Sequence, residues 1–474
     1  MVHIKGQVKD LRKRVLLKRI GDGILQAGEE VIEMVKTFKK GSLALAGSAL
    51  LLICLAMGAC QRDEVSSQKR IRFTSWGSPA SNKIYQEVVD EFEKKNPQIK
   101  VDFMMLPWSH YHRKILTMLA AGSKLDVMRL ANSYFPQFVE KDTLLPLDKY
   151  IQMDSKEVDL DDFYPMALRG CEAGGHIYGL PLDIVGWALY YNRGIFDKAG
   201  LVYPNESWTW ETFLDVARKL TRDLDGDGII DQYGAYVKLK MGVIELLAGQ
   251  SGAMILNGNN SKCLFDSSEG QAVIQLLYDL TVRYNVVPRV DLRASQDVFA
   301  AQKVAMALLM RGNVAGYRKS LALDWDVGPV PKWPGKEPRA LIVGGFNPWV
   351  VSKNTELPNE SWEFLKFLTG KESATEMVKT GRFVPARRSV AESSAFLDTG
   401  PPEQNIYFLD LVRTSNKVFV PRFPRYKRLE KVFEDDFQLL AEERITLEEC
   451  TARIARDVDR LIQEIQSERE ESAP

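Results

Sequence analysis

The order of apolar patterns near residue 70 limits the fold of this chain more than any other feature. Residues 71–76 alternate apolar and polar side chains, which predicts a strand. Apolar residues then recur every four positions over 84–92, which predicts one face of a helix that ends at Asn96-Pro97. Alternation resumes over 99–103. A strand, a helix and a second strand in this order predict the start of a parallel α/β fold.

The rest of the chain continues this mixture of strands and helices. Apolar patterns predict helices over 108–121 and 362–369, and a strand over 126–130. Two further helices begin after N-cap residues, Thr209 and Thr446. Thr446 is followed three residues later by a glutamate, which completes a capping box. The whole pattern therefore favours the α/β class.

The composition argues against several classes of protein. Lys plus Arg and Asp plus Glu both number 63, and this balance argues against a nucleic-acid partner. The five cysteines form no CxxC pair and there are four histidines, so no zinc site is expected. Cys171, Cys263 and Cys450 are expected to be buried thiols, with one disulfide bond as the alternative. The P-loop, G-x-S-x-G and H-E-x-x-H motifs are absent, which favours a protein that is not an enzyme.

An uncharged apolar run of eighteen residues, 42–59, stands directly before Cys60. Three lysines precede the run, and a glycine and an alanine stand just before the cysteine. This pattern is typical of a lipoprotein signal peptide in which Cys60 becomes the lipidated residue. An uncleaved membrane anchor is the alternative. Both interpretations place the rest of the chain outside the cytoplasm, anchored to the cell membrane.

The position of this segment is unusual, because signal peptides normally occupy roughly the first 15 to 30 residues. Met34 begins a stretch that is a complete signal peptide by itself. We therefore predict a signal peptide over 34–59 and a lipid-anchored tether over 60–70. Residues 1–33 are then either a misassigned start or a cytoplasmic extension.

Five segments follow one another in an order found in a known family. They are YGLPLDIVGWALYYNRGIFDKAGL (178–201), WTWETFLDVARKLT (208–221), VAMALLMRGNVAG (304–316), GGFNPWVVSKNTELPNESWEFLKFLTGKE (344–372) and GRFVPARRSV (381–390). Together they resemble the extracellular solute-binding proteins of carbohydrate transporters, relatives of the maltose-binding protein. Arg193 replaces the usual lysine of the first segment, and the third lacks the tryptophan that usually follows its glycine. The resemblance extends over about residues 70–470.

The resemblance implies a two-lobed α/β fold of the periplasmic-binding-protein type (type II), with a ligand cleft between the lobes. The chain would cross between lobes near Pro181, within 332–339 and near Pro385. The expected lobes are 71–181 with 335–385, and 182–334 with 386–474. Closure of the lobes would trap the ligand.

The resemblance also implies a function. The expected ligand is a mono- or oligosaccharide, which a monomeric protein would deliver to the permease of an ABC importer. A sensory ligand-binding subunit and a binder of a non-sugar solute are alternatives. A secreted glycosidase is a further alternative, and it would need two carboxylates about 5 to 10 Å apart.

Sugar recognition uses aromatic rings against C–H faces and planar polar groups for hydroxyls. Some candidates, such as Trp76, lie at the carboxyl ends of predicted strands, where ligands of open α/β sheets gather. Gly345 would let the backbone approach the ligand. Each aromatic candidate has a core position as its alternative, and each polar candidate has a cap, a turn or a surface pair. The side-chain candidates are Trp76, Trp108, Trp187, Phe346 and Trp349, together with Asn132, Ser133, Asp183, Arg311, Asn347 and Arg387.

The segment from Asp223 to Gly234 is similar to a calcium-binding loop. Carboxylates occupy positions 1, 3, 5 and 9 and a glycine occupies position 6. Gly234 stands at position 12, where a bidentate glutamate is expected. The interpretation is a structural Ca²⁺ site, with no other cofactor required, and the alternative is an Asp/Gly-rich turn. The predicted ligands are Asp223, Asp225, Asp227, Ile229 and Asp231.

Overall fold

The computed structural model describes residues 68–77, 79–288, 297–336, 346–414, 423 and 425–471. Met1–Gln68 and Lys69–Pro474 form two separate units, and every element below belongs to the second. The extension 1–33, the signal peptide 34–59, Cys60 with most of the tether, and Gly345 lie outside the described residues. Among the residues described, no helix has both the length and the apolar character needed to cross a membrane.

The predicted strand–helix–strand start is confirmed. Strand β1 (Lys69–Trp76), helix α3 (Pro79–Lys95) and strand β2 (Ile99–Leu106) follow one another. β1 pairs in parallel with β2 along its whole length and with the short strand β3 (Val127–Arg129) on its other side. The carboxyl ends of three parallel strands therefore meet at one edge of this sheet.

Three later strands complete the first sheet with antiparallel pairing. They are β6 (Gly179–Ile184), β11 (Phe346–Val351) and β12 (Val384–Pro385). The order across the sheet is β12-β6-β11-β3-β1-β2. The sheet is thus mixed, and segments more than 200 residues apart in the sequence lie side by side in it.

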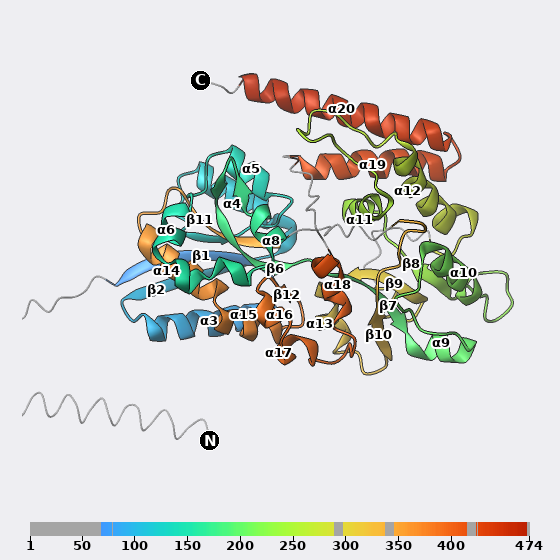
Figure 1. Ribbon diagram of the computed structural model, residues 1–474, viewed down its shortest axis with the longest axis horizontal. Helices are drawn as coiled ribbons and strands as arrows, with labels where there is room; N and C mark the ends of the chain where they lie inside the picture. Colours follow the sequence, from blue (N-terminus) through green and yellow to red (C-terminus); the bar gives the residue numbers. More distant parts are fainter. Residues whose placement is uncertain are drawn as a thin grey trace, which may run out of the picture. The chain divides into compact units, whose positions relative to one another are not determined.

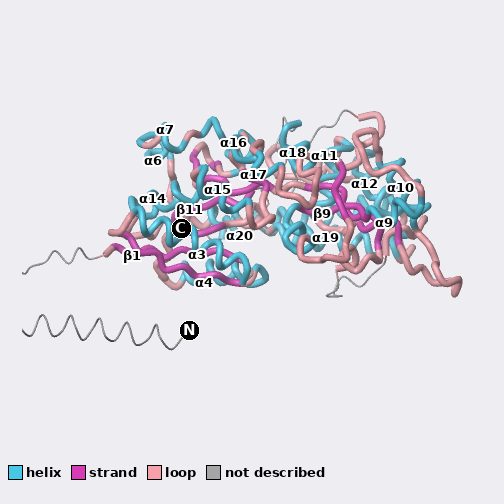
Figure 2. The backbone as a smooth tube through the Cα atoms, turned by 90° about the horizontal axis from the view of Figure 1, so that it is seen from below, coloured by secondary structure: helices cyan, strands magenta, loops and turns pink. Residues whose placement is uncertain are grey.

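Helices cover both faces of the first sheet. Phe73 of β1 contacts Phe364 of helix α14 (Pro358–Thr369), and α3 packs on the same face. Adjacent residues of a strand point to opposite faces, and Met128 of β3 accordingly belongs to the apolar cluster under helix α4 (Trp108–Ala120). Figures 1 and 2 show these helices around the strands labelled β1 and β11.

The second sheet contains four strands in the order β10-β7-β9-β8. Its strands are β7 (Trp187–Asn192), β8 (Tyr233–Tyr236), β9 (Val304–Met310) and β10 (Trp325–Gly328). A large apolar cluster lies between this sheet and five helices, which lie near it in Figure 1. These helices are α10 (Trp210–Leu220), α11 (Met241–Ser251), α12 (Ser268–Tyr278), α19 (Tyr426–Ala441) and α20 (Leu447–Glu471).

Both predicted N-caps are confirmed. The Thr209 side chain accepts a hydrogen bond from the Thr212 amide at the start of α10. At α20 the capping box is reciprocal: the Thr446 amide donates to Glu449 at 2.8 Å, and the Glu449 amide donates to Thr446 Oγ1 at 3.2 Å. Helix α14 begins four residues before the predicted Trp362, with Pro358 at its first position and Gly370 as its C-cap.

Shorter elements fill the connections. The cysteines Cys171, Cys263 and Cys450 are buried and form no disulfide bond. The short elements are α5 (Phe135–Glu140), α6 (Asp148–Met153), α7 (Ser155–Val158), η1 (Leu160–Asp162), α8 (Pro165–Gly170), β4 (Glu172–Ala173), β5 (His176–Ile177), α9 (Arg193–Ala199), η2 (Asp279–Arg283), η3 (Arg311–Asn313), α13 (Val314–Tyr317), α15 (Lys371–Val378), α16 (Arg388–Ala391), α17 (Ser394–Leu397) and α18 (Tyr407–Thr414).

The chain passes between the two sheets at several points. The first is Val185-Gly186, between the end of β6 and the start of β7. The chain returns to the first sheet between β10 and β11 and leaves it again after β12. An apolar cluster with Ile184 and Val384 from the first sheet and Tyr190 from the second lies at these connections. The predicted lobe boundaries stay predictions. β6 contains Pro181 and β12 contains Pro385, and both strands belong to the first sheet.

Candidate functional site

A cavity of about 340 Å³ lies at the carboxyl edge of the parallel strands, beside the connection between the sheets. β1 and β3 of the first sheet and β9 of the second each contribute their last residue to its wall. Its volume is at the lower end of the range of about 300–1,000 Å³ typical of small-molecule sites. The wall consists of Trp76, Gly77, Ser81, Tyr85, Arg129, Asp183, Ile184, Val185, Gly186, Met310, Arg311, Gly312, Asn313, Asn347, Arg382 and Phe383.

A buried ion pair forms the floor of this site on the first sheet. Arg129 Nη2 donates to Asp183 Oδ2 at 2.8 Å, and both side chains are almost completely buried. Asp183 Oδ1 also accepts hydrogen bonds from the amide and the side chain of Asn347. Burial raises the pKa of Asp183, and the Arg129 charge and the Asn347 hydrogen bonds oppose that rise. Arg129 Nη1 donates to the Tyr85 hydroxyl at 3.1 Å, so four elements fix this polar group.

Aromatic rings stand beside the ion pair. The Arg129 guanidinium lies 4.2 Å from the centroid of the Trp76 ring and 4.9 Å from that of Phe383. Trp108 meets Trp76 edge to face, with 5.0 Å between the ring centroids. The site therefore joins an aromatic surface to fixed hydrogen-bonding groups, which is the combination that sugar recognition needs.

Arg311 approaches the cavity from the second sheet, directly after β9. Its amide donates to the Gly186 carbonyl at 2.9 Å, which ties it to the connection between the sheets. The guanidinium lies 4.8 Å from the Phe396 ring centroid and 4.9 Å from that of Phe408, and Nη1 donates to Asn405. Only 2% of the side chain is exposed, and burial lowers its pKa to about 9. The cavity is thus lined by charged side chains from both sheets.

Comparison with known proteins identifies the family of this fold and site. The sequence model of the family described as bacterial extracellular solute-binding protein matches residues 76–375. The chain belongs to this family. Its expected two-lobed α/β fold is confirmed by solved structures of similar proteins. The family description implies a location outside the cytoplasm.

Three similar proteins illustrate the relationship. A Brucella abortus protein, named only as a binding protein, is 26% identical over 374 residues, which are 77% of this chain and 85% of that protein. The ABC substrate-binding protein of Listeria monocytogenes, solved with cycloalternan, has a TM-score of 0.73 at 22% identity and covers 84% of this chain and 99% of its own. The sugar-binding protein MalE of Xanthomonas citri has a TM-score of 0.72 at 20% identity and covers 85% and 100%. These relatives are binding proteins rather than enzymes.

The cavity brings together four of the residues predicted from the sequence: Trp76, Asp183, Arg311 and Asn347. Trp108 lies outside its wall, next to Trp76, with 47% of the side chain exposed. Asn132 and Ser133 follow β3 but do not line the cavity. The side chains that line it stay predicted ligand contacts.

Three aromatic candidates occupy core positions instead. Trp187 belongs to the apolar cluster of the second sheet, and Phe346 belongs to the cluster at the connections. Trp349 is fully buried, with its ring centroid 5.1 Å from that of Phe73 and 5.9 Å from that of Tyr85. None of the three is part of the cavity wall, so each occupies the core position that was the alternative to ligand contact.

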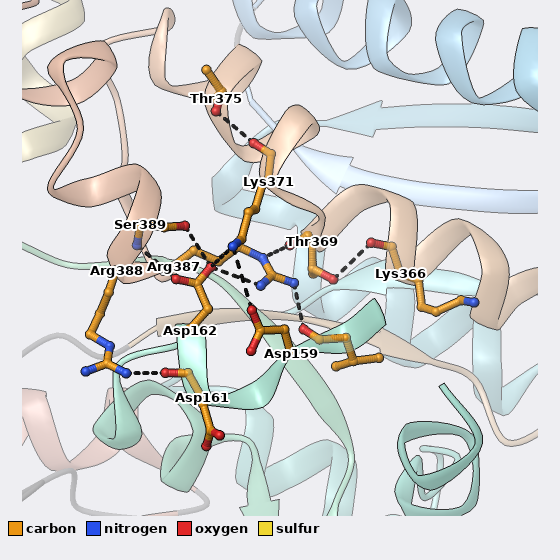
Figure 3. A network of polar contacts seen from close by, with 11 residues as sticks. Asp159, Asp161, Asp162, Lys366, Thr369, Lys371, Thr375, Arg387, Arg388 and Ser389 are labelled. Atoms are coloured by element: carbon orange, nitrogen blue, oxygen red, sulfur yellow. Dashed lines mark hydrogen bonds and ion pairs between the residues drawn. The ribbon is translucent and has the colours of Figure 1, made fainter. Parts of the chain in front are cut away.

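Arg387 is held in a separate polar network, drawn in Figure 3. Its Nε donates to the Thr369 carbonyl at 2.5 Å, and Nη2 donates to the Val158 carbonyl at 2.9 Å. Nη1 donates to Asp162, which also accepts from the Ser389 hydroxyl at 2.8 Å. Each nitrogen of the guanidinium therefore has a protein partner, and Arg387 joins α14, α7 and η1 rather than lining the cavity.

The sequence analysis missed several residues of the wall, of which Arg129 is central. A signal for it was available, because Arg129 stands between Met128 and Leu130 in the predicted strand 126–130. A charged residue inside a buried strand must find a partner there. Tyr85 and Phe383 carried no such signal, because each looks like an ordinary apolar position of its segment.

The acidic loop after α10 has its carboxylates close together. Oxygen atoms of Asp223, Asp225 and Asp227 lie within 4.8 Å of one another, and all three side chains are exposed. Asp223 accepts the amides of Gly226 and Gly228, both at 2.7 Å, and these hydrogen bonds lower its pKa. Both glycines have φ above +80°, a conformation that other residues rarely adopt. The loop is thus shaped by its own backbone hydrogen bonds.

Proposed function

We propose that this protein binds a carbohydrate in the cavity between the two sheets and delivers it to the permease of an ABC importer. One observation carries the proposal. The Trp76 ring and the hydrogen-bonded side chains of Asp183, Arg129 and Asn347 line the same cavity wall. Sugars present C–H faces and hydroxyls, which these two kinds of side chain recognise. The names of the similar solved proteins, one a sugar-binding protein, support a carbohydrate ligand.

The placement of the cavity supports capture by closure of the lobes. Side chains from both sheets reach the wall, so a ligand would contact both at once. Short connections such as Val185-Gly186 are the places where a hinge would rotate. Ligand contacts to both sheets would favour the closed form, and a permease that recognises this form would receive only loaded protein.

Thermal unfolding with a panel of saccharides tests the binding step. A sugar at about 100 times its Kd should add roughly 2.7 kcal/mol to the free energy of unfolding. In a chain of this size that should raise the Tm by a few degrees. Trp76→Ala should weaken binding about tenfold, because a stacking contact of about 1.4 kcal/mol is lost. Trp108→Ala is the matched control, since Trp108 lies beside Trp76 but outside the wall; an equal loss in both variants contradicts the proposed stacking role.

Transport is tested separately from binding. The loaded protein should stimulate sugar uptake by its permease in vesicles, and it should run as a monomer in solution. Binding of a sugar without uptake, together with capture of a membrane receptor, would instead favour a sensory subunit. Release of nitrophenol from nitrophenyl glycosides would contradict the proposal that the protein is not an enzyme.

We further propose that Cys60 carries a lipid and anchors the protein to the cell membrane. The apolar run before it and the small residues Gly58 and Ala59 support this proposal. Mass spectrometry should find the mature protein beginning at a lipidated Cys60. With lipoprotein signal peptidase inhibited, the precursor should begin at Met34, and peptides from 2–33 would contradict that start.

We also propose that the loop 223–231 binds a structural Ca²⁺ ion. Asp223, Asp225, Asp227 and Asp231 would supply carboxylate oxygens, and Ile229 would supply its carbonyl. The close spacing of the first three carboxylates supports the proposal. A chelator should lower the Tm of the protein, and Asp225→Asn should remove most of that effect. An unchanged Tm on chelation contradicts the site.

A further inference from the structure

The strands β6 and β11 pair irregularly where they reach the cavity. Their register shifts between Phe346 and Pro348, so that one residue of β11, Asn347, stands opposite two residues of β6. Asp183 is one of these two, and Asp183 and Asn347 both line the cavity. An irregularity of this kind is a β-bulge, and bulges beside functional sites turn side chains in a new direction. The bulge places these two polar side chains together in the cavity wall.

Asp183 determines how the Asn347 side chain is oriented. Asp183 Oδ1 accepts hydrogen bonds from the backbone amide of Asn347 at 3.1 Å and from its side-chain Nδ2 at 2.6 Å. An ionised carboxylate is only an acceptor, so the amide oxygen of Asn347 cannot take the place of Nδ2 there. Asp183 is held in turn by Arg129, whose Nη2 donates to Oδ2 at 2.8 Å. Two almost completely buried side chains therefore fix the direction of the Asn347 amide.

The amide oxygen of Asn347 is left available to a ligand. Because Nδ2 lies against Asp183, Oδ1 is the atom of the amide that is turned away from the ion pair. No donor among the described residues bonds to Oδ1. Some unpartnered polar atoms are sealed from solvent, such as Trp349 Nε1, but Asn347 Oδ1 is not among them. The half-buried Asn347 thus brings one fixed, accessible acceptor to the cavity wall.

We propose that Asn347 determines ligand specificity by accepting a hydrogen bond from one hydroxyl of the sugar, and that Asp183 is the positioning residue that keeps Asn347 an acceptor. The inference rests on the proposed function and adds a rule for its ligand: the group that reaches Asn347 must be a donor. A hydroxyl or an amino group satisfies this rule. A carboxylate, a phosphate or an ether oxygen at the same place does not, because two acceptors would then face each other.

Calorimetry on the full chain in mild detergent tests the rule with deoxy and deoxyfluoro sugars. The parent probes are glucose, galactose, arabinose and maltose, and a longer saccharide that raises the Tm in the panel is added. Each parent is compared with analogues in which one hydroxyl is replaced by hydrogen or by fluorine, neither of which donates a hydrogen bond. We expect one position at which both analogues bind at least about tenfold more weakly than the parent, since a site built to bond a hydroxyl rejects an analogue that lacks it.

Substitution of Asn347 assigns that position to its amide oxygen. In Asn347→Ala the parent sugar and the two analogues of this position should bind equally weakly, within about threefold of one another. The losses at the other positions of the sugar should remain. Asn354→Ala is the matched control, because Asn354 is exposed and does not line the cavity. It should leave the loss at every position unchanged.

Substitution of Asp183 tests the positioning role. In Asp183→Asn the Asn347 amide can face residue 183 with its oxygen or with its nitrogen, because an amide both donates and accepts. The preference for hydroxyl over fluorine at this position should therefore fall at least about threefold. If this variant does not fold, a crystal structure of the natural protein with the sugar decides the point. The sugar hydroxyl should then lie about 2.7–2.8 Å from the amide atom of Asn347 that is turned away from Asp183.

The outcomes separate the two proposals. If a sugar binds but Asn347→Ala removes the loss at no position, the role of Asn347 is contradicted and the carbohydrate function stands. A preference for hydroxyl over fluorine that survives Asp183→Asn unchanged contradicts the positioning role of Asp183. Failure of every saccharide to bind contradicts the proposed function and the inference together.

Discussion

Two buried arginines, Arg387 and Arg311, show how this protein treats similar residues differently. Arg387 lies in the network of Figure 3, where a carboxylate and two carbonyls accept from its three nitrogens. Arg311 is at least as buried, but one amide oxygen is its single hydrogen-bonding partner among the described residues. A satisfied charge holds the fold together. An unpaired buried charge contributes much less to stability, because nothing offsets its desolvation.

The difference also appears in what surrounds each guanidinium. Arg387 lies 4.2 Å from the Phe163 ring centroid, and Asp162 compensates its charge. Arg311 contacts two aromatic rings and has a cation, Arg318, as its charged neighbour. The energetic consequences should therefore differ: removal of Arg387 should damage the fold, whereas removal of the Arg311 charge should cost little stability.

The largest expected effect is the loss of Arg387. Arg387→Gln leaves Asp162 without its buried partner and two carbonyls without a donor, which should cost about 3–5 kcal/mol of the free energy of unfolding. Chemical denaturation measures this. Arg388→Gln is the matched control, because Arg388 is exposed and should change stability by less than about 1 kcal/mol. Equal effects in the two variants would contradict a structural role for Arg387.

Substitution of Gly186, whose carbonyl accepts the Arg311 amide, should have a smaller effect on the free energy of unfolding. A Cβ atom there would lie 2.8 Å from Val384 Cγ2 and 3.0 Å from the Phe408 carbonyl oxygen, too close for either. Gly186→Ala should therefore cost about 1–3 kcal/mol of stability. It should also weaken ligand binding, because Gly186 itself lines the cavity. Gly316→Ala is the control, since no atom lies within 4 Å of the added group there.

Glu245 is the acidic counterpart of Arg311, and its effect depends on pH. It is buried in α11 beside Tyr426 and Glu430, and its Oε1 has no hydrogen-bonding partner among the described residues. Burial raises its pKa to about 8. Since the folded state holds this proton more tightly, its contribution to stability is full below the unfolded pKa, about 4.5. That contribution is lost as the pH rises through about 8.

Glu245→Gln should remove this dependence, because the amide stays neutral. Compared with the natural protein, the variant should gain at least about 1 kcal/mol in relative stability between pH 5 and pH 9, since one pKa unit corresponds to about 1.4 kcal/mol. Urea unfolding at the two pH values measures the difference. The exposed Glu448→Gln is the control. Parallel curves for all three proteins would show that Glu245 keeps an ordinary pKa.

Local patterns explain what could be predicted from the sequence. β1, α3 and β2, and the caps at Thr209 and Thr446, follow from residues a few positions apart. Trp76 was placed at the ligand edge for the same reason: it ends a strand whose neighbours run parallel to it. These patterns depend on residues close together in the sequence, and the structure contains the elements that they predict.

Local sequence patterns do not predict the different environments of Arg387 and Arg311. Both were candidates for ligand contact, and nothing near either one in the sequence separates them. Asp162, the partner of Arg387, is 225 residues away in the chain, and Asn405, the partner of Arg311, is 94 residues away. Trp349 is similar, because its burial depends on β11 pairing with β3 and β6. Partners of this kind become visible only when the sheets assemble.

The smallest expected effect on stability completes the comparison. Arg311→Met replaces an unpaired buried cation with an apolar side chain of similar length between Phe396 and Phe408. Such replacements are often neutral or stabilising by about 1 kcal/mol or more, so the unliganded variant should unfold within about 1 kcal/mol of the natural protein or later. The same substitution at Arg387 should be strongly destabilising, because Asp162 would lose its buried partner and the Thr369 and Val158 carbonyls would lose their donor. A destabilisation of several kcal/mol for Arg311→Met would mean that Arg311 serves the fold as Arg387 does.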